Sequence, residues 1–159
     1  MGVAGSGKTT VGSALAAALG WRFVDADQHH TPESVAKMAR GEPLTDADRW
    51  PWLDRLREII AAALAADEPL VLACSALKAA YRARLVGADA RRIRFVHLTG
   101  TPAVLRARLE ARPGHFMKPG MLASQLAALE PPADDALTVD VARPVDALVA
   151  EITSRLVTA

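Results

Sequence analysis

The first ten residues, MGVAGSGKTT, constrain the fold more than any other stretch of the chain. Gly2, Gly7, Lys8 and Thr9 fit the pattern G-x-x-x-x-G-K-[ST] of a phosphate-binding loop. Such a loop joins a buried strand to a helix. Its glycines let the backbone wrap around phosphate groups, and the start of the helix contributes a positive dipole end. The motif therefore predicts a nucleotide site at the beginning of the chain.

The chemistry of this loop predicts ATP and Mg²⁺ as cofactors. Lys8 is expected to bind the β- and γ-phosphate oxygens, and the hydroxyl of Thr9 to ligate Mg²⁺. The residues expected to contact ATP are Gly2, Val3, Ala4, Gly5, Ser6, Gly7, Lys8, Thr9 and Thr10. A glycine-rich turn without a ligand is the alternative. It is disfavoured because an amphipathic helical pattern begins directly after Lys8.

The motif starts at residue 2, so the sequence leaves no room before it for the strand from which such a loop extends. We expect the sheet beside the loop to be unstable, or to leave backbone groups of the neighbouring strands unpaired. One hypothesis is that Met1 is an internal methionine and that the natural chain begins about ten residues earlier. The other is that the short chain is real and poorly active.

Downstream, apolar strand-like segments alternate with amphipathic helical patterns. The sequence predicts an α/β fold with a parallel sheet and helices on both of its faces. It contains no repeat or linker, so residues 1–159 are interpreted as one domain. The segments predicted to be strands are 21–27, 69–75, 92–100 and 136–141.

Composition excludes several classes of function. The formal net charge is +1, which gives no electrostatic footprint for nucleic acid. No apolar run reaches the ~18 residues of a membrane span. The one cysteine, Cys74, excludes an internal disulfide and is typical of a reducing compartment. We therefore expect a cytoplasmic protein with neither nucleic acid nor membrane as a partner.

Two carboxylates follow the strand predicted at 21–27. If the strand continues that far, Asp25 and Asp27 point the same way. Ligands of an open parallel sheet gather at the carboxyl ends of its strands. We expect Asp25 near Mg²⁺ and Asp27 near the hydroxyl that accepts the phosphoryl group. The alternative interpretation is a pair of turn-forming or capping aspartates.

Five basic residues further along the chain suggest a pocket for an anionic acceptor. Each alone is most simply a solvated surface residue. Together they favour a small carboxylated substrate, because arginine binds carboxylates in a bidentate manner. From the residues alone, the protein is interpreted as a kinase of a small, anionic, hydroxylated metabolite. The five residues are His30, Lys37, Arg49, Lys78 and Arg82.

At this point the chain resembles the P-loop gluconokinase family. The resemblance runs through most of the sequence, in the family's order: GVAGSGKTT, FVDADQHH, KMARGEPLTDADRWPWL, CSALK followed by YR, and RPGHFMKPGMLASQLAALEPP. It implies a fold like those of adenylate and shikimate kinases. It also implies ATP-dependent phosphorylation of D-gluconate at its 6-hydroxyl to 6-phosphogluconate with Mg²⁺, and, as is often so in the family, a homodimer.

Carried over by position, the resemblance assigns Asp27 to orient or deprotonate the 6-hydroxyl. It assigns His30, Arg49, Lys78 and Arg82 to hold gluconate. A lid is expected at about 106–130, where Arg108 and Arg112 lie one turn apart and would carry positive charge onto the phosphates. The catalytic residues would then be Lys8, Asp27 and Arg108.

Two rival functions remain at this stage. The first is another kinase of a small anionic metabolite, above all a shikimate kinase. That family has a Gly-Gly-Gly turn after its middle strand, where this chain has Cys74-Ser75-Ala76-Leu77-Lys78. The second is a truncated nucleotide-binding protein without catalysis, which the lack of room for a first strand would favour.

Overall fold

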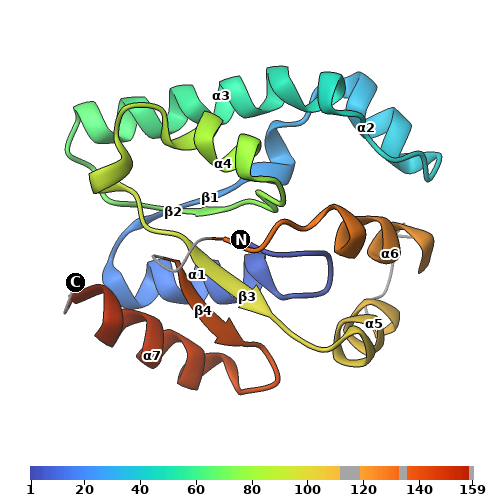
Figure 1. The fold of residues 1–159 in the computed structure, drawn as a ribbon. Helices are drawn as coiled ribbons and strands as arrows, with labels where there is room; N and C mark the ends of the chain where they lie inside the picture. The colour runs from blue at the N-terminus through green and yellow to red at the C-terminus, as the bar shows by residue number, and fades with distance from the viewer. Residues whose placement is uncertain (112–118, 133–135, 158–159) are drawn as a thin grey trace.

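A computed structural model of the chain describes residues 1–111, 119–132 and 136–157. Helices and short strands alternate along it (Figure 1). In chain order the elements are α1 (Lys8–Leu19), β1 (Arg22–Asp25), the 3-10 helix η1 (Ala26–His29), α2 (Pro32–Ala39), α3 (Asp46–Ala65), β2 (Leu70–Ala73), α4 (Ala79–Val86), the 3-10 helix η2 (Ala90–Arg92), β3 (Val96–Thr99), α5 (Pro102–Glu110), α6 (Pro119–Ala128), β4 (Leu137–Asp140) and α7 (Val145–Val157).

The strands pair in parallel, as the alternating pattern predicts. β1 pairs with β2 in the register Arg22↔Leu70, and β3 pairs with β4 in the register Val96↔Leu137. The predicted sheet is nevertheless divided, because the described residues form two two-stranded sheets rather than one. The first two residues of the chain bond across the division. Leu98 N–H donates to the carbonyl of Met1, and Gly2 N–H donates to the carbonyl of Ser75.

Helices cover both sides of the strands, so this part of the prediction is confirmed. In Figure 1, α3 and α4 lie on one side and α1 and α7 on the other. Each side has its own cluster of buried side chains. Leu53 and Leu56 of α3 belong to the first cluster, and Leu148 and Ile152 of α7 to the second. All four are at most 1% exposed.

Several helix starts are set by local side-chain bonds. Thr45 and Asp48 form both bonds of a capping box at the start of α3. The hydroxyls of Thr31 and Thr101 cap α2 and α5, and each is followed by proline at the first helical position.

One predicted strand is too long. The segment 21–27 is a strand only over β1, Arg22–Asp25, and then turns into η1. The cause is local, because the side chain of Asp25 accepts a hydrogen bond from the backbone N–H of Asp27 and so caps the 3-10 helix. Asp25 and Asp27 therefore do not alternate along a common strand.

Among the described residues, none of the helices has the length and apolar character that a membrane crossing requires. The predicted lid at 106–130 is described only in part, by the end of α5 and by α6. Arg112, Gly114 and His115 lie outside the described residues.

Candidate active site

The phosphate-binding loop has the backbone geometry that its glycines allow. Gly5 and Gly7 adopt left-handed φ angles of +78° and +83°, and Gly7 is the residue before α1. A Cβ atom at Gly5 would lie 2.6 Å from the carbonyl oxygen of Leu105, so no side chain fits there. The ammonium group of Lys8 donates a 3.0 Å bond to the carbonyl of Val3, which folds the side chain back along the loop.

One polar atom of the loop is buried without a bonding partner. Ser6 is 0% exposed, and its hydroxyl has no hydrogen-bond partner among the described residues. On the outer side of the loop, Ala4 N–H donates 2.7 Å to the side-chain oxygen of Gln125 in α6. The glycine cradle and the unpaired hydroxyl fit a loop built to surround phosphate oxygens.

The start of α1 and the end of β1 meet at a single hydrogen bond. The hydroxyl of Thr9 donates to Oδ2 of Asp25 over 2.8 Å, and Oδ1 of the same carboxylate accepts the N–H of Asp27 over 3.1 Å. A hydroxyl and a carboxylate are oxygen ligands of the kind that Mg²⁺ prefers. In the described ranges, no group of three or more His, Cys, Asp or Glu side chains is arranged to hold a metal ion, here or elsewhere.

Asp27 lies within η1, and His30 is the residue that directly follows it. The side chain of Asp27 is 72% exposed, whereas that of His30 is only 6% exposed. The two are 3.9 Å apart, from Nε2 of His30 to Oδ1 of Asp27. The other ring nitrogen, Nδ1, is buried without a hydrogen-bond partner among the described residues. Burial lowers the pKa of His30, Asp27 opposes this, and the positive charge of Arg49 adds to the lowering.

Trp52 of α3 holds this end of the site in place. Its indole N–H donates a buried 2.8 Å hydrogen bond to the carbonyl of Ala26 in η1. Its ring also stacks on the ring of His30, with centroids 4.4 Å apart and planes 14° from parallel. The sequence places Trp52 on the apolar face of a helix but gives no sign of this second role.

A second polar cluster joins the starts of α3 and α4. The ammonium of Lys78 donates to both carboxylate oxygens of Asp46, over 2.8 and 2.9 Å. The hydroxyl of Tyr81 donates to Asp46 as well, and a guanidinium nitrogen of Arg49 lies 3.4 Å from that hydroxyl. The bond to Asp46 raises the pKa of Lys78, and the bond from Lys78 lowers that of Asp46. Asp46 and Tyr81 were not among the residues predicted from the sequence.

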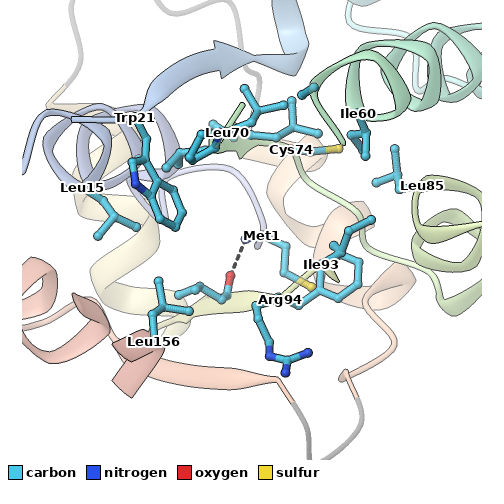
Figure 2. A pocket seen from close by; sticks show the side chains of 18 of the residues that line it. Met1, Leu15, Trp21, Ile60, Leu70, Cys74, Leu85, Ile93, Arg94 and Leu156 are labelled. Atoms are coloured by element: carbon cyan, nitrogen blue, oxygen red, sulfur yellow. Dashed lines mark hydrogen bonds between the residues drawn. The ribbon is translucent and has the colours of Figure 1, made fainter. Parts of the chain in front are cut away.

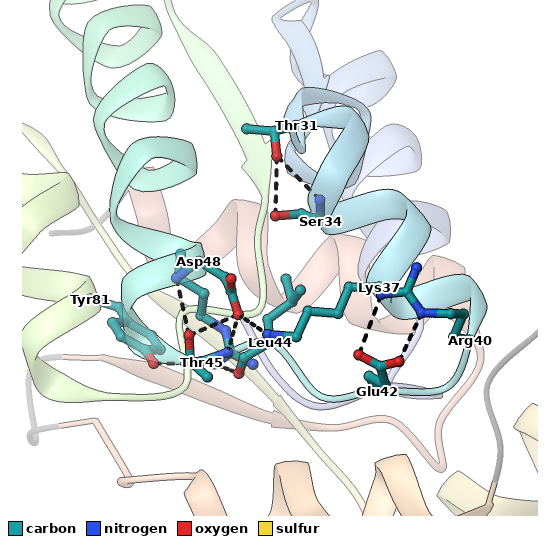
Figure 3. A network of polar contacts seen from close by, with 10 residues as sticks. Thr31, Ser34, Lys37, Arg40, Glu42, Leu44, Thr45, Asp48 and Tyr81 are labelled. Atoms are coloured by element: carbon teal, nitrogen blue, oxygen red, sulfur yellow. Dashed lines mark hydrogen bonds and ion pairs between the residues drawn. The ribbon is translucent and has the colours of Figure 1, made fainter.

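Lys37 contacts the same region from α2. It donates to Oδ2 of Asp48, which also accepts from the N–H and the hydroxyl of Thr45 (Figure 3). The bond from Lys37 is the main reason that the pKa of Asp48 is far below its usual range. Lys37 therefore ties α2 to the capping box of α3.

Arg82 differs from Arg49 and Lys78 because it is buried. One of its terminal nitrogens donates to the carbonyls of Ala76, Leu77 and Glu130 over 3.0–3.1 Å. The other lies 3.4 Å from the carbonyl of Pro131. The guanidinium thus links the segment after β2 to the segment after α6.

The side chain of Arg108 in α5 lies beside the phosphate-binding loop. A Cβ atom at Gly7 would lie 3.6 Å from one terminal nitrogen of Arg108, and the other donates to the carbonyl of Val141. The structure therefore places Arg108 beside the residue that precedes Lys8. Its predicted companion, Arg112, lies outside the described residues.

Several of the predicted residues fall into two groups. Lys8, Thr9 and Arg108 lie at the loop, with Asp25 bonded to it through Thr9. Arg49 and Lys78 gather around Tyr81, each with its charged group within 6 Å of that ring's centroid. A phosphate-binding loop, a hydroxyl–carboxylate pair and parallel strands with helices on both sides together define a P-loop kinase fold.

Comparisons with known proteins agree with this class. Residues 1–132 match a family model described as an AAA domain. A gluconokinase of Gluconobacter oxydans is 50% identical over 135 residues, covering 85% of this chain and 75% of its own. The structure of a sugar kinase from a Janibacter species superposes with a TM-score of 0.91 at 42% identity, over 98% of this chain and 91% of that one.

The structure of a gluconokinase from Sinorhizobium meliloti superposes with a TM-score of 0.83, also at 42% identity, over 99% of this chain and 93% of the other. The chain belongs to the gluconokinase family. The recognition made from the sequence is confirmed, and so is the fold class of a P-loop kinase.

Proposed function

We propose that this protein transfers the γ-phosphoryl group of ATP to the 6-hydroxyl of D-gluconate, giving 6-phosphogluconate and ADP. One structural observation supports this most directly. The carboxylate of Asp25 accepts from Thr9, on the nucleotide side, and from the N–H of Asp27, on the acceptor side. One side chain thus couples the two halves of a phosphoryl-transfer site. The identity to gluconokinases over most of the chain supports gluconate as the acceptor.

On the nucleotide side, the proposal assigns phosphate binding to residues 2–10. The backbone N–H groups of the loop and the start of α1 would hold the phosphate oxygens. Lys8 would leave the carbonyl of Val3 for the β- and γ-phosphates, and Arg108 would balance charge that develops during transfer. Thr9 and Asp25 are the residues that would hold Mg²⁺, which when bound neutralises charge on the β- and γ-phosphates.

On the acceptor side, Asp27 is assigned to the 6-hydroxyl. Its carboxylate is exposed and is held at the start of η1 by its backbone bond to Asp25. In this position it would accept a hydrogen bond from the 6-hydroxyl, orient its oxygen toward the phosphoryl group and take up its proton. His30, buried beside Asp27 and with a lowered pKa, would be neutral at pH 7 and would offer gluconate a hydrogen bond rather than a charge.

Arg49 and Lys78 are assigned to the carboxylate of gluconate. Both are basic side chains that lie at the ring of Tyr81. Arg49 suits this role best because its guanidinium matches a carboxylate in two bonds. For Arg82 we propose an indirect role. Its bonds to four carbonyls hold the segment that ends in Lys78, so it would position the pocket instead of contacting the substrate.

The remaining features of the protein form part of the same proposal. Residues 1–159 would be a single domain in which α5 and α6 belong to a lid at about 106–130 that closes over the phosphates. The resemblance to the family supports a homodimer. The net charge of +1 and the single cysteine support a cytoplasmic protein without nucleic-acid partners.

A substrate panel tests the proposal. ADP release would be followed in a coupled assay with ATP, Mg²⁺ and either gluconate, shikimate or no acceptor. Gluconate-dependent release at several times the background is expected, with shikimate at background. Turnover with shikimate alone would favour the rival metabolite kinase. ATP binding without acceptor-dependent release would favour a nucleotide-binding protein without catalysis.

A further inference from the structure

The end of α6 contacts both the phosphate-binding loop and the start of α4. Gln125 of α6 bonds to the loop, and Glu130, which follows the end of α6, bonds to the segment after β2. The apolar side chains between them, Leu126 and Leu129, pack against the cluster of buried side chains that contains those of α7. We call residues 125–130 the brace.

At the loop, Gln125 holds one peptide unit in place. Its side-chain oxygen accepts a 2.7 Å hydrogen bond from the N–H of Ala4. The carbonyl of Val3, on the other side of the same peptide unit, accepts the 3.0 Å bond from the ammonium of Lys8 and a 3.3 Å bond from the N–H of Ser6. Because a trans peptide unit is planar and rigid, its N–H and its carbonyl point in opposite directions and turn together. Gln125 therefore sets the direction in which the carbonyl of Val3 faces Lys8.

At the other end of the brace, Glu130 holds both peptide units that flank Lys78. Its backbone N–H donates 2.9 Å to the carbonyl of Leu77, and its carboxylate oxygen Oε2 accepts 2.6 Å from the N–H of Ala79. The first N–H groups of a helix have no partner within it, and Lys78, the residue before α4, provides no side-chain cap. Glu130 supplies that cap from another part of the chain, where a carboxylate also suits the positive end of the helix dipole.

We propose that Gln125 and Glu130 are positioning residues for the two substrates, Gln125 through Lys8 and Glu130 through Lys78. The brace holds these two lysines at a fixed separation, so that the phosphates and the acceptor meet in one arrangement. These roles rest on the proposed function, which assigns Lys8 to ATP and Lys78 to gluconate. Within the proposed lid, the brace is the end that stays attached to the rest of the protein.

Two variants separate the ends of the brace. Gln125→Met and Glu130→Met nearly keep the side-chain length but remove the acceptor oxygen. Gln125→Met should raise the Kd for a non-hydrolysable ATP analogue by about 5- to 20-fold and change KM for gluconate by less than about twofold. Glu130→Met should do the reverse and raise KM for gluconate by a similar factor. Glu130→Gln keeps an oxygen for the N–H of Ala79 and should leave both constants within about threefold of those of the unsubstituted protein.

A variant that lowers only the stability of the fold serves as the control. Ile60 of α3 lines the apolar cavity of about 510 Å³ between β2 and β3 (Figure 2), and no residue of the brace lines that cavity. Ile60→Ala should lower Tm while leaving the Kd for the analogue and KM for gluconate unchanged.

Amide hydrogen exchange measures the two bonds directly and needs no turnover of gluconate. Gln125→Met should speed exchange at the N–H of Ala4, and Glu130→Met should speed exchange at the N–H of Ala79. Each variant is the control for the other, because the two bonds lie at opposite ends of the brace.

Equal changes in the Kd for the analogue and in KM for gluconate, in either variant, would overturn the proposal. So would effects on these constants no larger than those of Ile60→Ala, or unchanged exchange at Ala4 and Ala79. If exchange and the Kd for the analogue respond as expected but the unsubstituted protein shows no turnover of gluconate, the role of Gln125 stands and the proposed function fails.

Discussion

The hydroxyl of Thr9 donates a 2.8 Å hydrogen bond to Oδ2 of Asp25, which joins the first turn of α1 to the end of β1. The bond brings together the two side chains assigned to Mg²⁺. Replacing Asp25 with Asn removes the charge while keeping one oxygen. We expect kcat to fall and the Mg²⁺ concentration for half-maximal rate to rise by about 10- to 100-fold. Steady-state rates over a Mg²⁺ titration would measure both.

A matched pair at Thr9 serves as the control for this prediction. Thr9→Ser keeps the hydroxyl and should leave the Mg²⁺ dependence nearly unchanged. Thr9→Val introduces a side chain of nearly the same size that lacks the hydroxyl donor. It should shift the Mg²⁺ dependence as Asp25→Asn does. If the Ser and Val variants show the same Mg²⁺ dependence, the hydroxyl of Thr9 is not a metal ligand.

Lys8→Met and Asp27→Asn separate the two halves of the site. Lys8→Met removes the charge assigned to the transferred phosphoryl group, so kcat should fall by at least about 100-fold with Tm unchanged. Asp27→Asn should lower kcat by a similar factor while the Kd for ATP changes less than about threefold. Calorimetry with ATP and steady-state kinetics would supply these values. An Asp27→Asn variant with near-normal kcat would exclude the assigned role.

Trp52 is expected to matter for both stability and substrate binding. Trp52→Phe keeps a ring against His30 but removes the donor to the buried carbonyl of Ala26. The free energy of unfolding should fall by about 1–3 kcal/mol, and KM for gluconate should rise because η1 carries Asp27. Trp50→Phe, at an exposed position on the same helix, is the control and should change stability by less than about 0.5 kcal/mol. Equal effects at the two positions would contradict this account.

Substitutions at Arg82 test whether this residue binds gluconate directly, as its position in the sequence predicts, or supports the pocket through its bonds to carbonyls. Arg82→Lys cannot reproduce the bonds to four carbonyls, so the free energy of unfolding should fall by about 2–4 kcal/mol with less than a threefold change in KM for gluconate. Arg84→Lys, which alters an exposed pair with Asp54, should be nearly neutral. An unchanged free energy of unfolding together with a tenfold rise in KM for gluconate would instead show that Arg82 binds gluconate directly.

Stability should depend on pH through the Met1 amine. Its pKa is lowered on folding, so the unfolded chain binds more protons than the folded one between about pH 5 and 8. The free energy of unfolding therefore rises with pH in this window, by about 2 kcal/mol between pH 6.5 and 8.0. The charged or titratable neighbours are Lys8, Cys74 and His97. His97 and His30 add a slope of the same sign below about pH 6.5, because their pKa values are also lowered.

Denaturant unfolding at several pH values would measure this slope, on protein whose mass shows that Met1 is retained. Nα-acetylation removes the titrating group. The acetylated protein should lose the dependence between pH 6.5 and 8.0 while keeping the slope at lower pH. An unchanged dependence after acetylation would show that the amine is not its source.

The parts of the fold that depend on local chemistry could be predicted from the sequence. The loop, the helix after Lys8 and the capping box of Thr45 and Asp48 each follow from residues within one or two turns. The end of β1 could not be predicted, because the side chain of Asp25 caps the following turn and redirects the chain before Asp27.

In the candidate site too, features set by neighbouring residues could be predicted from the sequence, whereas contacts between distant residues could not. Residues inside recognisable motifs could be proposed from the sequence, but their partners across the fold could not. Lys78 is 32 positions from Asp46, and no short spacing indicates their bond. Trp52 has the pattern of a core residue, and only the structure shows its contacts with Ala26 and His30. Charge and the resemblance to the family placed Arg82 in the substrate pocket, although burial and carbonyl bonds distinguish it from Arg49.

The position of the phosphoryl group in the product tests the central claim most directly. The protein would be incubated with ATP, Mg²⁺ and D-gluconate, and the product examined by phosphorus–proton correlation in NMR. We predict a single phosphate ester whose phosphorus couples to the two protons on carbon 6, and no ester with the Lys8→Met variant. Release of inorganic phosphate without an ester, or an ester at another carbon, would contradict the assignment of Asp27 and of the enzyme as a gluconate 6-kinase.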